Sequence, residues 1–526
     1  MAVLVAVVLA GYLHTLPYPF HFDDYQSIRD NPTLTHPTDL AAIWSFHPPR
    51  VALYTSLAWN AALTGRSPAG FRAVNLLVHL LNALLVGWIA AELTRRLVPA
   101  ARAAGPRASR LSPEAIGLMS AALFAAHPLA TQAVTYLVQR TASLAALFEL
   151  ASVAAYLRAR RGGPAGLWVA AWGCAWLAAL TKEMAIALPL VIALLEVALR
   201  RAGAPRRPSL SALLPFLLVE PIVAYTAQLP SGLVGQTEPG FRSPEGIPRL
   251  AYLFTQMLVI PAYLRLLIWP AGQALEHEVV LRTSPDASVL AGAALLAAAC
   301  VAALRVWNRH PVVTIGWAWF MVTILPESSI FPISDFMAEH RAYLPLAGVS
   351  WIGATLLLGL FHHRRARLLA PALLVVALTA VTHARNRVWR SEERLWSDVV
   401  RKSPGKASGH NNLGIEFRRT GRYAEAESCF RRAIASEPRS PNAYLNLGSL
   451  YAAAGRPTAA VAVLESATVT LAGQWRVQMS LGSARWLAGD TAGAALAYRR
   501  AAELAPGERG PREALARLRT AAPTAP

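Results

Sequence analysis

Long apolar runs separated by short polar segments fill the chain from Met1 to about residue 383. A helix needs ~17–25 mostly apolar residues to cross a bilayer. The runs predict about eleven membrane-spanning helices, although the run at 114–127 needs its flanking residues to reach that length. The predicted spans lie at residues 1–17, 71–94, 114–127, 132–157, 165–181, 184–200, 209–228, 288–305, 311–325, 342–361 and 367–383.

A further apolar run, at 250–268, carries Pro261 and Arg265. If this run spans the membrane, Arg305 and Arg309 lie outside the cytoplasm. If it lies in the outer interface, both lie inside. We therefore expect an interfacial or re-entrant helix here.

The pattern changes at about residue 391, where a soluble, helical and repetitive segment begins. Leu-Gly pairs recur every 34 residues, and Gly, Ala and a bulky residue keep the same interval. This spacing is typical of tetratricopeptide repeats, which are pairs of helices that cross at small residues. We predict a membrane domain over 1–390 and a repeat domain over 391–526, with a half-repeat at 391–406 and repeats at about 407–440, 441–474 and 475–508.

Composition agrees with a membrane protein and sets its orientation. The chain is 55% hydrophobic, 15% charged and has a net charge of +20. Arginines cluster between the apolar runs, for example at Arg95 and Arg96 and at Arg160 and Arg161, as in cytoplasmic loops. This orientation puts the N-terminus in the cytoplasm and both the 18–70 loop and the repeats outside it. The basic stretch 383–390 then also lies outside, where it can meet lipid phosphate.

Several polar groups share the predicted outer side of the membrane. Adjacent carboxylates, Asp23 and Asp24, follow the first apolar run, where an ionisable pair is costly unless it has a partner or a role. Taken singly, each group also has a plain structural explanation, such as a solvated turn or a local ion pair. The other candidates, for binding donor phosphate or substrate, are Arg50, His127, Arg140, Lys182, Glu183, Glu339, His340, Arg341 and Tyr343.

Together these groups suit a reaction in which a phosphate leaves and a hydroxyl attacks. Fixed cations stabilise the charge that develops on the phosphate, and a carboxylate takes the proton of the hydroxyl. The sequence shows no P-loop, dinucleotide fingerprint, HExxH motif or nucleic-acid module. Its three cysteines suggest neither a disulfide framework nor a metal site.

The residues resemble the transmembrane and tetratricopeptide-repeat O-mannosyltransferases, which are relatives of the protein O-mannosyltransferases in the GT-C superfamily. The resemblance rests on the order of several short motifs and covers nearly the whole chain. Two departures are Val51, where the family favours Pro, and Arg72, where a His is common. The matching stretches are Phe22-Asp23-Asp24 with Ile28 and Asn31-Pro32, Phe71 to His79, His127-Pro128 through Arg140, Lys182-Glu183, and Glu339 to Pro345.

The resemblance implies an all-α membrane bundle of GT-C type followed by a repeat solenoid, with amphipathic outer-loop helices at 39–46 and 51–63. It also implies a polyprenyl-phosphate sugar donor, usually of mannose, and transfer to Ser or Thr of extracytoplasmic proteins. The base is expected at Asp23 or Asp24, with Asp23 slightly favoured. The Ala- and Arg-rich composition suggests a bacterial inner-membrane protein with periplasmic repeats.

Two other functions stay open at this point: a non-catalytic membrane anchor whose repeats recruit envelope or secretion partners, and a polysaccharide ligase or polymerase. The expected partners are the lipid-linked sugar, membrane lipid and an acceptor protein that binds the repeats. We predict no nucleic-acid partner and no metal-ligand set, and leave a divalent cation open as a cofactor.

Overall fold

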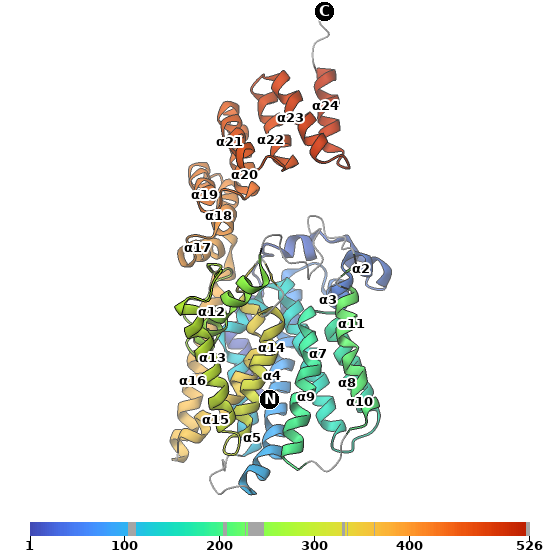
Figure 1. Cartoon of the computed structure of the whole chain (residues 1–526), viewed down its shortest axis with the longest axis vertical. Coiled ribbons are helices and arrows are strands. Elements are labelled where there is room, and N and C mark those ends of the chain that lie inside the picture. The colour runs from blue at the N-terminus through green and yellow to red at the C-terminus, as the bar shows by residue number, and fades with distance from the viewer. Residues whose placement is uncertain are drawn as a thin grey trace, which may run out of the picture. The chain divides into compact units, whose positions relative to one another are not determined.

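The computed structural model describes residues 1–103, 112–203, 208–226, 228–229, 247–328, 332–333, 335–361 and 363–521. Every regular element among these residues is a helix, which confirms the expected all-α class. The chain divides into two compact units (Figure 1). The first comprises Met1–Leu275 with Val279–Ser391, and the second comprises Glu276–Glu278 with Glu392–Pro526.

The first unit is a bundle of apolar helices. In the described part of the chain, five helices are long and apolar enough to cross a membrane, and the other predicted spans form shorter helices. Helix α12 covers the run for which an interfacial position was expected, and its 20 residues also meet the length of a span. The five long helices are α4 (Pro68–Ala103), α7 (Arg140–Ala159), α12 (Arg249–Ile268), α13 (Ala287–Arg305) and α16 (Arg364–Asn386). The shorter ones are α1 (Ala2–Tyr12), α5 (Pro113–Ala126), α8 (Gly166–Ala179), α9 (Leu188–Arg201), α10 (Leu210–Leu217), α11 (Val219–Thr226), α14 (Pro311–Ile324) and α15 (Pro345–Leu360).

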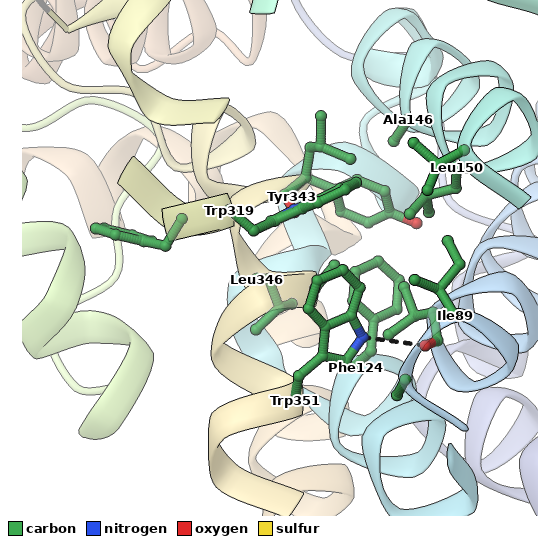
Figure 2. Packing of buried hydrophobic residues seen from close by; sticks show 14 of the residues in the cluster. Ile89, Phe124, Ala146, Leu150, Trp319, Tyr343, Leu346 and Trp351 are labelled. Atoms are coloured by element: carbon green, nitrogen blue, oxygen red, sulfur yellow. Dashed lines mark hydrogen bonds between the residues drawn. The ribbon is translucent and has the colours of Figure 1, made fainter. Parts of the chain in front are cut away.

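Small residues let the bundle helices approach closely. Where α4 crosses α5, a Cβ on Gly87 would lie 2.6 Å from the carbonyl oxygen of Gly117, so only glycine fits. Large aromatic side chains fill the remaining core. Figure 2 shows Trp351 of α15 packed beside Phe124 of α5, and the Trp351 indole donates to the carbonyl of Val86 at 3.0 Å.

Short helical turns connect the spans and carry several of the candidate site residues. The two amphipathic helices expected in the first outer loop are present as α2 (Leu40–Phe46) and α3 (Val51–Thr64), at one end of the bundle in Figure 1. The other connecting elements are η1 (Leu13–Thr15), the π-helical turn η2 (Tyr25–Arg29), η3 (Pro32–Thr35), η4 (Pro48–Arg50), η5 (Pro128–Ala130), α6 (Thr131–Thr135), η6 (Leu137–Gln139), η7 (Glu183–Ala187), η8 (Leu325–Glu327), η9 (Glu339–Ala342) and η10 (Arg387–Arg390).

The second unit is a stack of helix pairs, as the 34-residue period predicts. In each pair a glycine of the first helix faces a bulky residue of the second: a Cβ on Gly448 would lie 2.8 Å from Leu464. The turns between paired helices hold glycines with positive φ, for example 80° at Gly421. The helices are α17 (Glu392–Lys402), the pairs α18 (Ala407–Arg419) and α19 (Tyr423–Ser436), α20 (Pro441–Ala453) and α21 (Pro457–Thr470), α22 (Trp475–Leu487) and α23 (Thr491–Leu504), and a further helix that the period did not predict, α24 (Gly510–Ala521).

Candidate functional site

The two adjacent carboxylates lie in a tight turn after η1. The amide of Asp24 donates to the carbonyl of His21 at 2.8 Å, which closes the turn. Phe22, the residue before Asp23, has φ 43° and is the one non-glycine residue with positive φ in the described chain. A bulky residue in this region is strained, and such strain gathers at functional sites. The turn thus holds Phe22, the neighbour of Asp23, in a backbone conformation that its side chain does not favour.

Asp24 is fully buried and anchors this turn to the segment before α7. Its Oδ2 accepts from the amide of His21 at 3.0 Å and its Oδ1 from the amide of Val138 at 2.8 Å. Burial raises the pKa of the Asp24 carboxyl to about 7, although both amides and the nearby Arg72 oppose the rise. With both oxygens engaged inside the protein, Asp24 is suited to hold the turn in place.

Arg72, one of the two departures from the family pattern, supports the same turn from α4. Its guanidinium donates to the carbonyls of Tyr18 and Pro19, the latter at 2.6 Å, and to the carbonyl of Thr135 at 3.4 Å. A fully buried guanidinium needs such partners. Arg72 therefore fixes the chain just before the two carboxylates.

Asp23, by contrast, keeps an exposed side chain. Its amide donates to the Tyr136 hydroxyl at 3.1 Å. Desolvation by the surrounding atoms raises the pKa of the Asp23 carboxyl, while Tyr136 and Arg50 lower it. A general base has to meet its substrate directly, and of the two carboxylates Asp23 is the accessible one.

Arg50 links the carboxylate turn to the loop before α9. Its Nη2 lies 3.7 Å from Oε1 of Glu183, and both side chains are partly buried. The Arg50 Nε is buried and has no hydrogen-bond partner among the described residues. Arg50 therefore lies within electrostatic range of both Asp23 and Glu183, and its buried Nε is a donor without a partner among the described residues.

Lys182 and Arg341 share one carboxylate, that of Glu327, which is not among the site residues predicted from the sequence. Lys182 Nζ lies 2.9 Å from Oε1 of Glu327, and Arg341 Nε lies 3.9 Å from the same oxygen. All three side chains are at most 8% exposed. The cluster thus brings together the loops before α9, after α14 and before α15.

His340 lies among these cations. Its pKa lies well below the ordinary value because burial removes the imidazole from water and because Lys182, Arg341 and Arg50 surround it. The ring is therefore neutral at pH 7. Its Nδ1 has no hydrogen-bond partner in the described part of the chain, while its amide donates to Oε1 of Gln132 at 2.8 Å.

The structure places Arg140 inside the bundle with its own partners. Its Nε donates to Asn75 Oδ1 and its Nη2 to Asn60 Oδ1, both at 2.6 Å, and Nη2 also donates to the carbonyl of Phe71 at 2.9 Å. The side chain is fully buried. These bonds tie α3 and α4 to the start of α7.

Three other predicted site residues also make contacts within the bundle. His127 Nε2 bonds the carbonyl of Leu267 at 2.9 Å, and Glu339 Oε1 accepts from the amide of Ala274 at 2.7 Å. The Tyr343 hydroxyl lies 2.7 Å from Nδ1 of His79, and Figure 2 shows the Tyr343 ring in the aromatic core. These side chains hold loops and helices in register around the cluster.

Sequence reasoning missed two buried acids beside this cluster. One is Glu327; the other is Glu149 of α7, which is 1% exposed and within electrostatic range of Lys182 and Glu327. Oε1 of Glu149 has no hydrogen-bond partner among the described residues. A single acid inside an apolar run is a signal in itself, because its burial is costly.

Metal-ligating side chains do not gather in the described chain, where no three His, Cys, Asp or Glu residues form a candidate metal site.

The fold and the site describe an apolar helical bundle with a cluster of cations and carboxylates, followed by a tetratricopeptide-type solenoid. A family model for the tetratricopeptide repeat matches residues 411–474. The curated relatives named protein O-mannosyl-transferase confirm the resemblance drawn from the motifs. The long apolar helices and these relatives together indicate a membrane protein.

Three relatives illustrate the similarity. The protein O-mannosyl-transferase Tmtc3 of Drosophila melanogaster is 25% identical over 536 residues, which cover 86% of this chain and 56% of the relative. TMTC1 of Homo sapiens is 24% identical over 74% of this chain and 48% of its own. Tmtc1 of Drosophila melanogaster is 34% identical over 154 residues, or 27% of this chain and 17% of its own. The chain thus spans about half the length of the longer-matching relatives.

Two solved structures also show some likeness. The APC/C hetero-tetramer Cut9-Hcn1 matches 77% of this chain and 89% of its own at 12% identity, with a TM-score of 0.24. The first tetratricopeptide domain of Spaghetti (RPAP3), bound to an HSP90 peptide, matches 22% of this chain and 92% of its own at 22% identity, with a TM-score of 0.21.

Proposed function

We propose that this protein is a membrane glycosyltransferase that moves a sugar, mannose in the first instance, from a polyprenyl-phosphate donor to Ser or Thr of extracytoplasmic proteins. The observation that carries the proposal is the cluster in which Asp23, an accessible carboxylate, lies within electrostatic range of Arg50, while Lys182 and Arg341 share a neighbouring anion. The relatives, which are named protein O-mannosyl-transferase, support the transfer of mannose to protein.

The cations supply the part of the site that a phosphate needs. In the described chain, Nε and Nη1 of Arg341 and Nε of Arg50 are buried and lack hydrogen-bond partners. A buried donor without a partner is costly, whereas charge-assisted bonds to phosphate oxygens are strong. The phosphate oxygens of a lipid-linked phosphodiester would accept hydrogen bonds from these N–H groups, and its sugar would then lie towards Asp23.

In the proposed reaction, the acceptor hydroxyl attacks the anomeric carbon on the face opposite the phosphate. The new bond joins this carbon to the Ser or Thr oxygen, and the bond between the carbon and the phosphate oxygen breaks. Asp23 takes the hydroxyl proton, while the lipid phosphate leaves with the bonding electron pair. Arg50, Lys182 and Arg341 stabilise the charge on the leaving phosphate.

The bundle and the repeats have separate roles in this proposal. Apolar helices hold the polyprenyl chain in the membrane, and the repeats offer a surface for the acceptor protein or a partner that delivers it. We assign both the cluster and the repeats to the extracytoplasmic side, because the arginine-rich loops connect the opposite ends of the spans. The Ala- and Arg-rich composition favours a bacterial inner membrane.

The test is transfer by the purified protein in vesicles, with a panel of polyprenyl-phosphate sugars and a mixture of periplasmic proteins. Mass spectrometry should find a hexose on Ser or Thr with one donor of the panel. A membrane anchor without catalysis would yield no product from any donor, and a polysaccharide ligase would modify glycan rather than protein.

A further inference from the structure

The carboxylate of Glu327 holds two cations that come from distant parts of the chain. One oxygen, Oε1, lies 2.9 Å from Lys182 Nζ and 3.9 Å from Arg341 Nε. Lys182 precedes η7, Glu327 ends η8 and Arg341 lies in η9, so no local helix spacing places these groups together. Glu327 is the carboxylate that pairs with both of them.

The backbone of Glu327 is itself held in place. Its carbonyl accepts from the hydroxyl of Tyr252 on α12 at 2.7 Å, and the amide of the next residue, Ser328, donates back to the carbonyl of Leu325 at 3.1 Å. The acidic side chain is 8% exposed. Because this carboxylate is shielded from water and its backbone is hydrogen-bonded, it keeps its two cations in a defined geometry.

The pairing of Glu327 with Lys182 and Arg341 leaves other polar nitrogen atoms of the cluster without hydrogen-bond partners in the described chain. Among the described residues, the donors Nη1 of Arg341 and Nε of Arg50 are buried without a hydrogen-bond partner, and Nδ1 of His340, which donates or accepts according to its tautomer, also has none. An anion with several oxygens could meet these donors while Glu327 keeps Lys182 and Arg341 side by side. Glu327 would then lie close to a bound phosphate and repel it.

That repulsion acts unequally on donor and product. Under the proposed reaction, the donor is a phosphodiester with one negative charge, and the released lipid phosphate is a monoester that carries up to two. The repulsion energy of two charges is proportional to one charge multiplied by the other, and it is strong where water is excluded. A fixed negative charge in the cluster therefore weakens product binding more than donor binding.

We propose that Glu327 is a positioning residue that holds Lys182 and Arg341 for the donor phosphate and, through its own charge, promotes release of the lipid monophosphate. This inference rests on the proposed function, since it assigns roles to the donor and the product of that reaction. It adds to the cluster a residue that touches no substrate and acts through its two cations and through its own charge.

The test compares Glu327→Gln with the unmodified full chain in vesicles. Glutamine keeps the shape and removes the charge. We expect the inhibition constant of polyprenyl monophosphate to fall by at least about tenfold and the Michaelis constant of the donor to fall less. The turnover number should drop and a product burst should appear, because release becomes slow.

Two controls separate charge from structure. Glu92→Gln removes another fully buried carboxylate, whose Oε1 lies 2.6 Å from Arg96 Nε and 2.8 Å from Arg161 Nε, and should leave both constants unchanged. Glu327→Asp keeps the charge on a shorter side chain and should keep product release fast while weakening donor binding. If Glu327→Gln does not fold, Glu327→Asp carries the test, and tighter product binding by it would overturn the proposal.

The two proposals fail in different ways. If the unmodified protein transfers no sugar from any donor, the proposed function fails, whatever Glu327 does. If the unmodified protein transfers sugar and Glu327→Gln leaves the inhibition constant of the monophosphate unchanged or raises it, the role of Glu327 is wrong and the function stands.

Discussion

The burial of Asp24 predicts how the stability of the bundle depends on pH. The pKa of its carboxyl rises from 3.8 to about 7 on folding, because burial outweighs the two amide hydrogen bonds. The folded protein therefore binds this proton more tightly than the unfolded chain does. The stability that Asp24 contributes is fully present below about pH 4 and is lost as the pH rises through about 7.

The size of the effect follows from the shift. Each pKa unit corresponds to about 1.4 kcal/mol, so a shift of about three units removes about 4 kcal/mol of the free energy of unfolding over its full range. Between pH 5 and pH 8, where the protein is easier to handle, about 3 kcal/mol of this remains to be measured.

The assay is the denaturant midpoint of unfolding in detergent, followed by tryptophan fluorescence at several pH values, in the parent protein and in Asp24→Asn. All other titrating groups are common to both proteins, so the difference between the two curves reports Asp24. We expect the parent to lose stability with rising pH relative to the variant, and to level off above pH 7. Parallel curves would refute the assignment of a buried, titrating Asp24.

Three further predictions concern the donor site, the repeats and the topology. Arg341→Ala should weaken donor affinity at least about tenfold, because in the proposed site its guanidinium binds the donor phosphate, whereas Arg419→Ala, which removes an exposed guanidinium that pairs with Glu416 on α18, should not. Gly448→Val should lower the unfolding temperature of the repeats by forcing Leu464 away, as circular dichroism of the full chain would show. Alkaline phosphatase fused after residue 400 should be active, because arginine-rich loops are expected on the cytoplasmic side and the repeats on the other.

Each of these predictions can fail on its own terms. Equal donor affinity in Arg341→Ala and the parent would remove Arg341 from the phosphate site. An unchanged unfolding temperature in Gly448→Val would mean that the helix pair tolerates a wider crossing than the structure shows. An inactive fusion after residue 400, together with an active one after residue 307, would reverse the side assigned to the repeats.

The sequence alone predicted the helical architecture well, because apolar length and the 34-residue period reflect local physics. Glycine is required where a bulky side chain such as Leu464 meets the facing helix, and that need repeats with each pair. The two amphipathic helices of the first outer loop were expected at nearly the bounds observed for α2 and α3. Helix α24 lacks the repeated Leu-Gly signal and was therefore not predicted.

The candidate site was harder to predict because burial and partners depend on tertiary packing. Asp23 and Asp24 look alike in sequence, yet one is exposed and the other holds two amides inside the protein. Arg140 resembles a ligand for phosphate in sequence but donates to asparagine side chains. Glu327 belongs to no motif that we recognised, and only the folded chain shows that it joins two cations.

The central claim is that this cluster transfers a lipid-linked sugar with Asp23 as the base. The most direct test is the ratio of initial transfer rates of the parent protein and Asp23→Asn, measured in the same vesicles with polyprenyl-phosphate mannose and a Ser/Thr acceptor. General-base catalysis contributes ~10²–10⁴-fold in rate, so we predict a ratio in that range with unchanged folding. Equal rates in the two proteins, or no transfer by the parent protein, would contradict the claim.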